Sequence, residues 1–220
     1  MKTNELAFFG KMAASVTHEL KNVLAVINET NGLTADLLGM LKDAPFPYRE
    51  KFERSVRKIE EQVHRGVEIT SRFNSFAHSV DYPLADVDLN SIVAQTVSMA
   101  YRLAALRNVE LRGAVRENPI MLFTSAFTAQ MALTIVIEAF IKCMDGGSIL
   151  IKVTDDPGVP GLEFDFESHS PEGVTKEAVV ELEEWGDFQE LASVLDIHPT
   201  WRTSDGGLTA LSLAFNGVMK

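Results

Sequence analysis

The 220-residue sequence contains one cysteine, Cys143, and no long hydrophobic run. A single cysteine excludes an internal disulfide framework and is typical of a reducing compartment. The longest apolar-rich run, 131–141, has 11 residues and includes Glu138, whereas a membrane-spanning helix needs about 18 or more. The N-terminus also lacks the basic and apolar pattern of a secretion signal. We therefore expect a cytoplasmic protein without a membrane-inserted segment.

Basic residues are scarce as well, with 20 Lys and Arg against 31 Asp and Glu. The net charge of −11 argues against general binding to nucleic acids, which requires a basic surface. Residues 1–80 carry 11 basic and 10 acidic side chains, a net of +1, and residues 81–220 carry 9 and 21, a net of −12. This asymmetry predicts two domains, 1–80 and 88–220, joined by a linker at 81–87 that contains Pro83.

The first domain has heptad spacing, which predicts two long helices with coiled-coil-like packing. Pro45 and Pro47 lie between the two patterns and are expected to end the first helix and form a turn. Apolar residues alternate at intervals of three and four in both patterns, with Thr30 and Thr34 as weak points. The first pattern comprises Leu6, Phe9, Ala13, Val16, Leu20, Val23, Ile27, Thr30, Thr34, Leu37 and Leu41, and the second comprises Phe52, Val56, Ile59, Val63, Gly66, Thr70, Phe73, Ala77 and Val80.

Further apolar residues, such as Leu24, Leu33 and Ile69, make this surface wider than one partner helix can cover. The simplest solution is a homodimer in which two hairpins form a four-helix bundle. The alternative is a monomer whose hairpin packs on its own C-terminal domain.

His18 lies at position f of the heptad frame, farthest from the partner helix, and Asn22 follows one turn later on the same outer face. Glu19, at position g, is beside the histidine. An unprotonated imidazole can attack a phosphoryl group, and a neighbouring carboxylate can hold its tautomer or take its proton. An amide can bind a phosphoryl oxygen or orient a water molecule. The alternative is an inert, solvent-facing histidine on a charged helix.

The run 15–24, Ser-Val-Thr-His-Glu-Leu-Lys-Asn-Val-Leu, closely resembles the phosphoacceptor motif of two-component sensor histidine kinases. In that family the motif lies in a two-helix domain for dimerisation and histidine phosphotransfer. Val23 stands where the family has proline, but no reacting group is lost. The resemblance implies that His18 is phosphorylated, that Glu19 supports the transfer, and that Asn22 assists dephosphorylation or orientation.

The second domain alternates helical and strand patterns, which predicts an α+β fold with helices on one face of a mixed sheet. Asp88 is expected to cap the first helix, and Thr124 or Ser125 to open the longest one. The expected helices cover 89–105, 125–143, 175–184 and 188–195, and the expected strands cover 109–112, 148–153, 162–167, 201–204 and 208–215.

This order of elements resembles the ATP-binding domain of the same kinases, with its closest match over 130–153 and 201–215. In the family, an asparagine on the long helix holds Mg²⁺, and many relatives have a second one four residues earlier. Here Ile135 and Met131 stand at these positions. Mg²⁺ demands oxygen ligands, which neither side chain supplies.

The two glycine loops of the family are also replaced. The adenine-binding pattern Asp-x-Gly-x-Gly becomes His-Ser-Pro-Glu-Gly at 169–173, where Pro171 and Gly173 mark the degenerate site. The phosphate loop becomes Asp-Phe-Gln-Glu-Leu at 187–191, which puts side chains where bare backbone is needed. The acidic charge of this half repels a triphosphate as well. We therefore expect that ATP binding is lost, and that the protein holds no cofactor or metal of its own.

Four interpretations follow from these patterns. The leading one is a histidine phosphotransferase of a phosphorelay, in which His18 shuttles a phosphoryl group between the aspartates of response-regulator receiver domains. The receivers supply Mg²⁺. The second is a response-regulator phosphatase or sequestering partner, in which Glu19 and Asn22 direct water at the phospho-aspartate. The third is an ATP-dependent sensor histidine kinase core, and the fourth is a structural dimerisation module with an inert His18.

Overall fold

The computed structural model describes residues 2–40, 47–78, 84–156, 158–169, 173–204 and 207–216. The chain divides into two compact units. We call residues Phe9–Ser75 the helical unit, and residues Phe76–Lys220 together with Met1–Phe8 the α/β unit. Each unit is described by itself.

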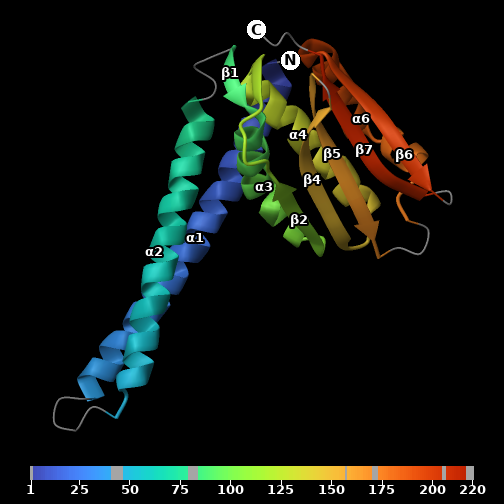
Figure 1. Cartoon of the computed structure of the whole chain (residues 1–220). Helices are drawn as coiled ribbons and strands as arrows, with labels where there is room; N and C mark the ends of the chain where they lie inside the picture. Colours follow the sequence, from blue (N-terminus) through green and yellow to red (C-terminus); the bar gives the residue numbers. More distant parts are fainter. Residues whose placement is uncertain are drawn as a thin grey trace. The chain divides into compact units, whose positions relative to one another are not determined.

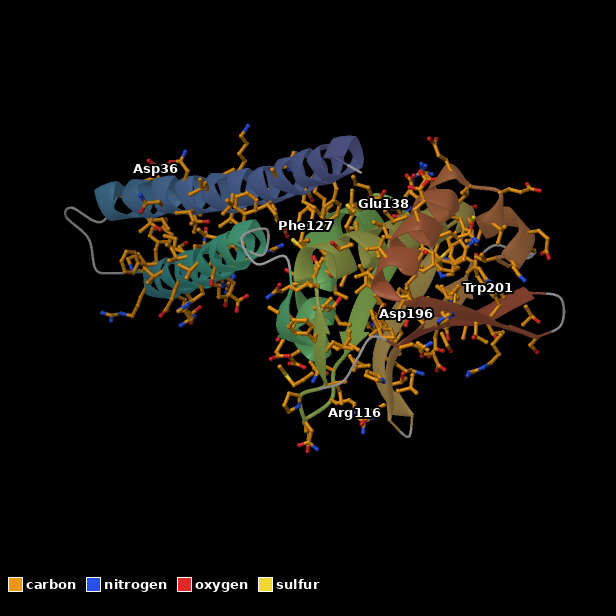
Figure 2. All side chains as sticks on the ribbon, turned by 90° about the horizontal axis from the view of Figure 1, so that it is seen from above. Asp36, Arg116, Phe127, Glu138, Asp196 and Trp201 are labelled. Atoms are coloured by element: carbon orange, nitrogen blue, oxygen red, sulfur yellow. The ribbon has the colours of Figure 1, made fainter. Side chains whose placement is uncertain are left out.

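The helical unit is a hairpin of two long helices, α1 (Lys2–Met40) and α2 (Arg49–His78), which run antiparallel side by side (Figure 1). The predicted two-helix pattern is therefore confirmed. Of the predicted turn, Pro47 lies in a described turn just before α2, and residues 41–46 lie outside the described residues. Side chains of the two helices meet along the hairpin in Figure 2.

The core of the hairpin forms where Val16 and Val23 of α1 meet Ile69 of α2. Leu20, Ile27 and Phe73 pack against this cluster. A Cβ atom added to Gly66 would lie 3.3 Å from Cγ1 of Val23, so the two helices approach each other closely here. The absence of a side chain at Gly66 thus makes room for Val23.

The two threonines in the apolar pattern of α1 are buried without an energetic penalty for their hydroxyl groups. Thr30 donates a hydrogen bond to the carbonyl oxygen of Val26 at 2.7 Å, and Thr34 donates to that of Thr30 at 2.8 Å. A buried hydroxyl is costly only when it lacks a partner. The helix backbone supplies the partner, so these positions can be buried in the hairpin.

The buried face of α2 matches the predicted seam in part, since Phe52, Ile59, Gly66 and Phe73 are half-buried. Val56 and Val63, which were expected in the apolar seam, are 44% and 47% exposed. Ser55 and Ile69 are buried instead. Within one hairpin, α1 therefore covers part of the predicted seam, and a row of apolar side chains on α2 is left uncovered.

The α/β unit contains a five-stranded mixed sheet in the order β2-β4-β5-β7-β6 and a small antiparallel ladder of β1 and β3. β2 pairs with β4 in parallel, and the other neighbours are antiparallel. The strands are β1 (Ala85–Asp88), β2 (Val109–Ala114), β3 (Met121–Thr124), β4 (Gly147–Asp156), β5 (Val159–Ser168), β6 (Ile197–Ser204) and β7 (Gly207–Phe215). The helices α3 (Leu89–Ala105), α4 (Ala126–Cys143), α5 (Lys176–Val180) and α6 (Glu183–Leu195) complete an α+β fold, with α3, α4 and α6 on one face of the sheet (Figure 1).

The starts of α3 and α4 agree with the sequence, whereas α5 ends at Val180 instead of at 184 and α6 begins at Glu183 instead of at 188. The Asp88 carboxylate accepts a hydrogen bond from the backbone N–H of Asn90 and so caps α3, and Ser125 caps α4. The expected linker 81–87 needs a correction, because its residues 85–87 belong to β1 and pair with β3. The same Asp88 carboxylate accepts from the N–H of Ile120, which ties this strand end to the start of β3.

The core of the α/β unit lies between α4 and the sheet. Phe140 of α4 is fully buried and stacks on Phe166 of β5, with ring centroids 3.8 Å apart. α4 is the one described helix that is long and apolar enough to cross a membrane by length and composition, and 67% of it is buried inside the fold. Its apolar character is explained by this burial between the sheet and its neighbouring helices.

The opposite face of the sheet is polar. Lys152 of β4 pairs with Asp165 and, at 3.7 Å, with Glu163 of β5. Arg202 of β6 pairs with Glu163 at 2.9 Å. Charge alternating with buried apolar residues along the strands is typical of a sheet with one solvated face.

We predict that replacing Phe140 with alanine lowers the free energy of unfolding of the α/β unit by about 3–5 kcal/mol, because a large buried ring is lost and a cavity remains. Tyr101→Ala is the control, since Tyr101 is 50% exposed. Urea unfolding followed by tryptophan emission measures both variants, as Trp185 and Trp201 both lie in this unit. Equal unfolding midpoints for the two variants would contradict the packing described here.

Candidate functional site

The predicted phosphoacceptor residues lie on the exposed side of α1. His18 and Asn22 are both exposed and are separated by one helical turn. Val16, two residues before the histidine, is 5% exposed and belongs to the hairpin core. The structure thus gives His18 the outward position that the heptad frame predicts, where an approaching macromolecule can reach the imidazole ring.

Glu19 has a partner that the sequence analysis did not identify. Nη2 of Arg65 on α2 donates a hydrogen bond to Oε1 of Glu19 at 3.0 Å. The Glu19 side chain is 18% exposed and that of Arg65 is 51% exposed. The ion pair fixes the direction of the carboxylate next to His18, and it brings a cation to the same region of the hairpin. The two residues are 46 positions apart, so no local spacing indicates the contact.

An apolar groove runs along the hairpin near these residues, with a volume of about 720 Å³. Leu24 and Val67, at its walls, are 62% and 63% exposed. Its lining is otherwise apolar or small: Leu20, Val23, Ile27, Val63, Gly66, Thr70 and Ser71. Large exposed apolar patches are typical of sites of association, which makes this groove a candidate for one.

Two residues of the predicted degenerate site, Met131 and Ile135, line a cavity in the α/β unit. Met131 and Ile135 of α4 and the segment 186–194 of α6 line a volume of about 600 Å³. Met131 and Ile135 and most of the 187–191 segment, which are far apart in the sequence, thus lie around one cavity. Gly173 is not part of this lining and has a left-handed φ of 65°. Pro171 lies outside the described residues.

The chemistry of this cavity differs from that of a magnesium nucleotide site. α4 presents a thioether and a branched alkyl group to the cavity, from Met131 and Ile135, and neither is a ligand for Mg²⁺. α6 adds the carboxylates of Asp187 and Glu190. Among the described residues, no group of three or more His, Cys, Asp or Glu side chains is arranged to hold a metal ion.

Cys143, at the end of α4, is a poor alternative nucleophile. Burial raises the pKa of its thiol, and the nearby Glu184 carboxylate raises it further. The reactive form of cysteine is the thiolate, which a raised pKa makes rare near neutral pH. His18 therefore remains the favoured candidate for covalent chemistry.

Comparison with known proteins gives matches only at the level of structure. No family model and no curated protein matches the chain. The ATP-binding domain of PrrB from Mycobacterium tuberculosis has a TM-score of 0.51 and 13% identity, over 62% of this chain and 99% of that one. Full-length ShkA, solved with AMPPNP, has a TM-score of 0.50 and 13% identity, over 94% of this chain and 45% of that one. The histidine kinase AdeS from Acinetobacter baumannii has a TM-score of 0.49 and 11% identity, over 90% of this chain and 96% of that one.

At these identities the similarity establishes the fold. The α/β unit has the fold of a histidine kinase ATP-binding domain, as the order of its strands and helices predicted. The fold does not establish the activity, because one fold can carry different sites. The function depends on the side chains of the two units.

Proposed function

We propose that the protein carries a phosphoryl group on His18 within a two-component system, accepting it from the phospho-aspartate of one receiver domain and passing it to the aspartate of another. The observation that carries this proposal is an exposed His18 beside a carboxylate that Arg65 holds in place. Phosphoryl transfer depends mainly on positioning and electrostatics. An outward-facing imidazole is open to a receiver domain, which brings its own Mg²⁺ and acceptor.

In the transfer, a ring nitrogen of unprotonated His18 attacks phosphorus as the bond to the aspartate oxygen breaks, and the aspartate leaves as a carboxylate. The carboxylate of Glu19 is suited to hold the imidazole tautomer or to take its proton. The reverse sequence delivers the group to the second receiver. No nucleotide is required in either direction.

A second candidate is an ATP-dependent sensor histidine kinase core. The structural comparisons favour this alternative over the receiver-to-receiver route, because their matches include histidine kinases and a structure solved with AMPPNP. The side chains of the cavity favour the opposite conclusion. Met131 and Ile135 offer no oxygen to a magnesium ion, and Asp187 and Glu190 place negative charge where phosphates would need cations or bare amides. The cavity side chains are the better basis for a choice between the two candidates, because ligand binding depends on side chains and not on the fold alone.

A phosphatase or sequestering role is a further alternative, in which Asn22 orients the attacking water. For any of these functions we propose a homodimer in the cytoplasm, with the apolar groove of one hairpin covered by that of a second copy. The exposed Leu24 and Val67 support this proposal, since removing apolar area from water is favourable by about 25 cal/mol per Å², before the entropic cost of association is subtracted.

The central prediction is that label moves from a phosphorylated receiver domain to the wild-type protein, and that His18→Gln abolishes this transfer because it removes the nucleophile. Asn22→Ala should keep the acceptance of label and slow any hydrolysis, since a lost hydrogen bond misplaces the attacking water. Receiver domains labelled with ³²P, followed by gel autoradiography, measure both effects.

The same assay distinguishes the alternatives. Label from Mg-ATP on wild-type His18, together with heat in a calorimetric titration with Mg-ATP, would replace the receiver-to-receiver route by the kinase core. Phosphate released without ever appearing on the protein, and lost in Asn22→Ala, would indicate a phosphatase.

For the ion pair, we predict that Arg65→Met slows phosphorylation of His18 by about threefold to fivefold, because an exposed pair is worth up to ~1 kcal/mol. Arg65→Lys should restore part of the rate. Arg57→Met is the matched control, since Arg57 is an exposed arginine of the same helix. The initial rate of label transfer is the measurement, with helix content checked by circular dichroism. Equal rates for the two methionine variants would remove Arg65 from the site.

For the dimer, we predict that Val67→Asp converts the protein to a monomer, because a charge on the groove cannot be buried without a partner. His64→Asp is the control, since it adds a carboxylate to an exposed position of the same helix outside the groove lining. Light scattering coupled to gel filtration should give a dimer mass for the wild type and this control. A monomeric wild type would overturn the proposed assembly.

A further inference from the structure

The cavity between α4 and α6 is lined by apolar side chains and two carboxylates, and it has no role in the proposed phosphotransfer. Its volume of about 600 Å³ lies within the range of small-molecule sites, about 300–1,000 Å³. Met131, Ile135, Leu191 and Val194 supply an apolar lining. Val194 is 63% exposed, so its side chain is accessible to a ligand.

The wall formed by α6 is fixed in place from behind. Trp185 is 2% exposed and Phe188 is fully buried, and their rings lie 4.8 Å apart. Trp185 also contacts Trp201 of β6, with ring centroids 4.6 Å apart; Trp201 is labelled in Figure 2. These buried aromatic side chains hold the pocket-lining face of α6 in position. The pocket is therefore formed before any ligand arrives, and binding a ligand requires little reorganisation of the protein.

Two features of α6 define which ligand fits. Gly186 has no side chain, and a Cβ atom built there meets nothing within 4 Å, so the pocket is open at this point. Asp187 and Glu190 both line the pocket. No salt bridge or hydrogen bond of their carboxylates is found among the described residues. Residues 81–220 carry 9 basic and 21 acidic side chains, so the surrounding field also favours cations and repels anions.

From these observations we propose that the α4–α6 pocket binds an organic cation with an apolar body, whose ring or chain packs on Met131, Ile135 and Val194 while its positive charge faces Asp187 and Glu190. The charge of this ligand is positive, whereas that of a nucleoside triphosphate is negative. This site lies in the α/β unit and does not involve His18, so the proposal of a cation site is independent of the proposed phosphotransfer.

The test is a pair of dye titrations on the full chain, using the cation ethidium and the anion 1-anilinonaphthalene-8-sulfonate. We expect ethidium to bind at least about tenfold more tightly, because the two dyes have comparable apolar bodies and opposite charges. Dye fluorescence gives the dissociation constant, and quenching of tryptophan emission places the cation near α6, since Trp185 is adjacent to Gly186. Tighter binding of the anionic dye would overturn the proposal.

Charge variants separate the pocket from the general acidity of the protein. The double variant Asp187→Asn/Glu190→Gln should weaken ethidium binding by about fivefold or more, because both facing carboxylates are neutralised. Glu177→Gln/Glu181→Gln removes the same charge at exposed positions outside the pocket lining and should change binding less than about twofold, because exposed charges that do not contact the ligand are screened by solvent and salt. Equal effects of the two pairs would show non-specific attraction and would overturn the proposal.

A steric variant supplies the remaining control. Gly186→Leu should reduce ethidium affinity about tenfold by filling the opening, whereas Gly186→Ala should change it little. Both replacements raise helix propensity and have open space at Cβ, so α6 is expected to fold. Unchanged tryptophan emission in the free variants verifies this. Full ethidium affinity in a folded Gly186→Leu variant would show that the dye binds elsewhere and would overturn the proposal.

Discussion

The packing of α4 against the sheet is the constraint on which the α/β unit depends. Phe140 stacks on Phe166 at one point of this contact, and α4 carries eleven buried residues along its length. A helix of this composition cannot remain in water, so the sheet, α3 and α6 have to cover it. The side of α4 that carries Met131 and Ile135 is the one that meets α6 across the pocket. The pocket therefore depends on the same helix that holds the unit together.

Much of the fold could be predicted because its signals are local. The Asp88 cap and the apolar period after it located α3 at Leu89–Ala105, with both ends correct. The strands β1 and β3 were missed because each has only four residues and is stabilised by pairing with the other across the chain. A short strand of this kind has no periodicity of its own. On α2, Val56 and Val63 fit the apolar pattern whether or not α1 covers them, so the pattern alone does not show which seam positions a single hairpin buries.

The candidate site also has features that the sequence predicts and features that it does not. The exposed position of His18 and Asn22 follows from the heptad frame, because position f is fixed once Val16 is buried. The pairing of Glu19 with Arg65 does not follow, since it depends on how two helices are aligned along their length. In the α/β unit, the sequence alone shows that Met131 and Ile135 offer no oxygen ligand to Mg²⁺. That these residues would line a cavity with α6, rather than close against it, required the packing of Trp185 and Phe188.

The edges of the five-stranded sheet restrict how another protein can approach the α/β unit. One edge is β2, where the paired side chains of Glu110 and Arg112 are solvent-exposed, and the other is β6, where Pro199 lacks a backbone donor. Charge and proline on edge strands disfavour the addition of a foreign strand. Recognition of this unit by strand exchange is thereby discouraged, and so is fibril growth from its sheet. Partners are left with the two faces of the unit, the helices on one and the charged side chains of the sheet on the other, where the fold presents side chains instead of an unpaired backbone.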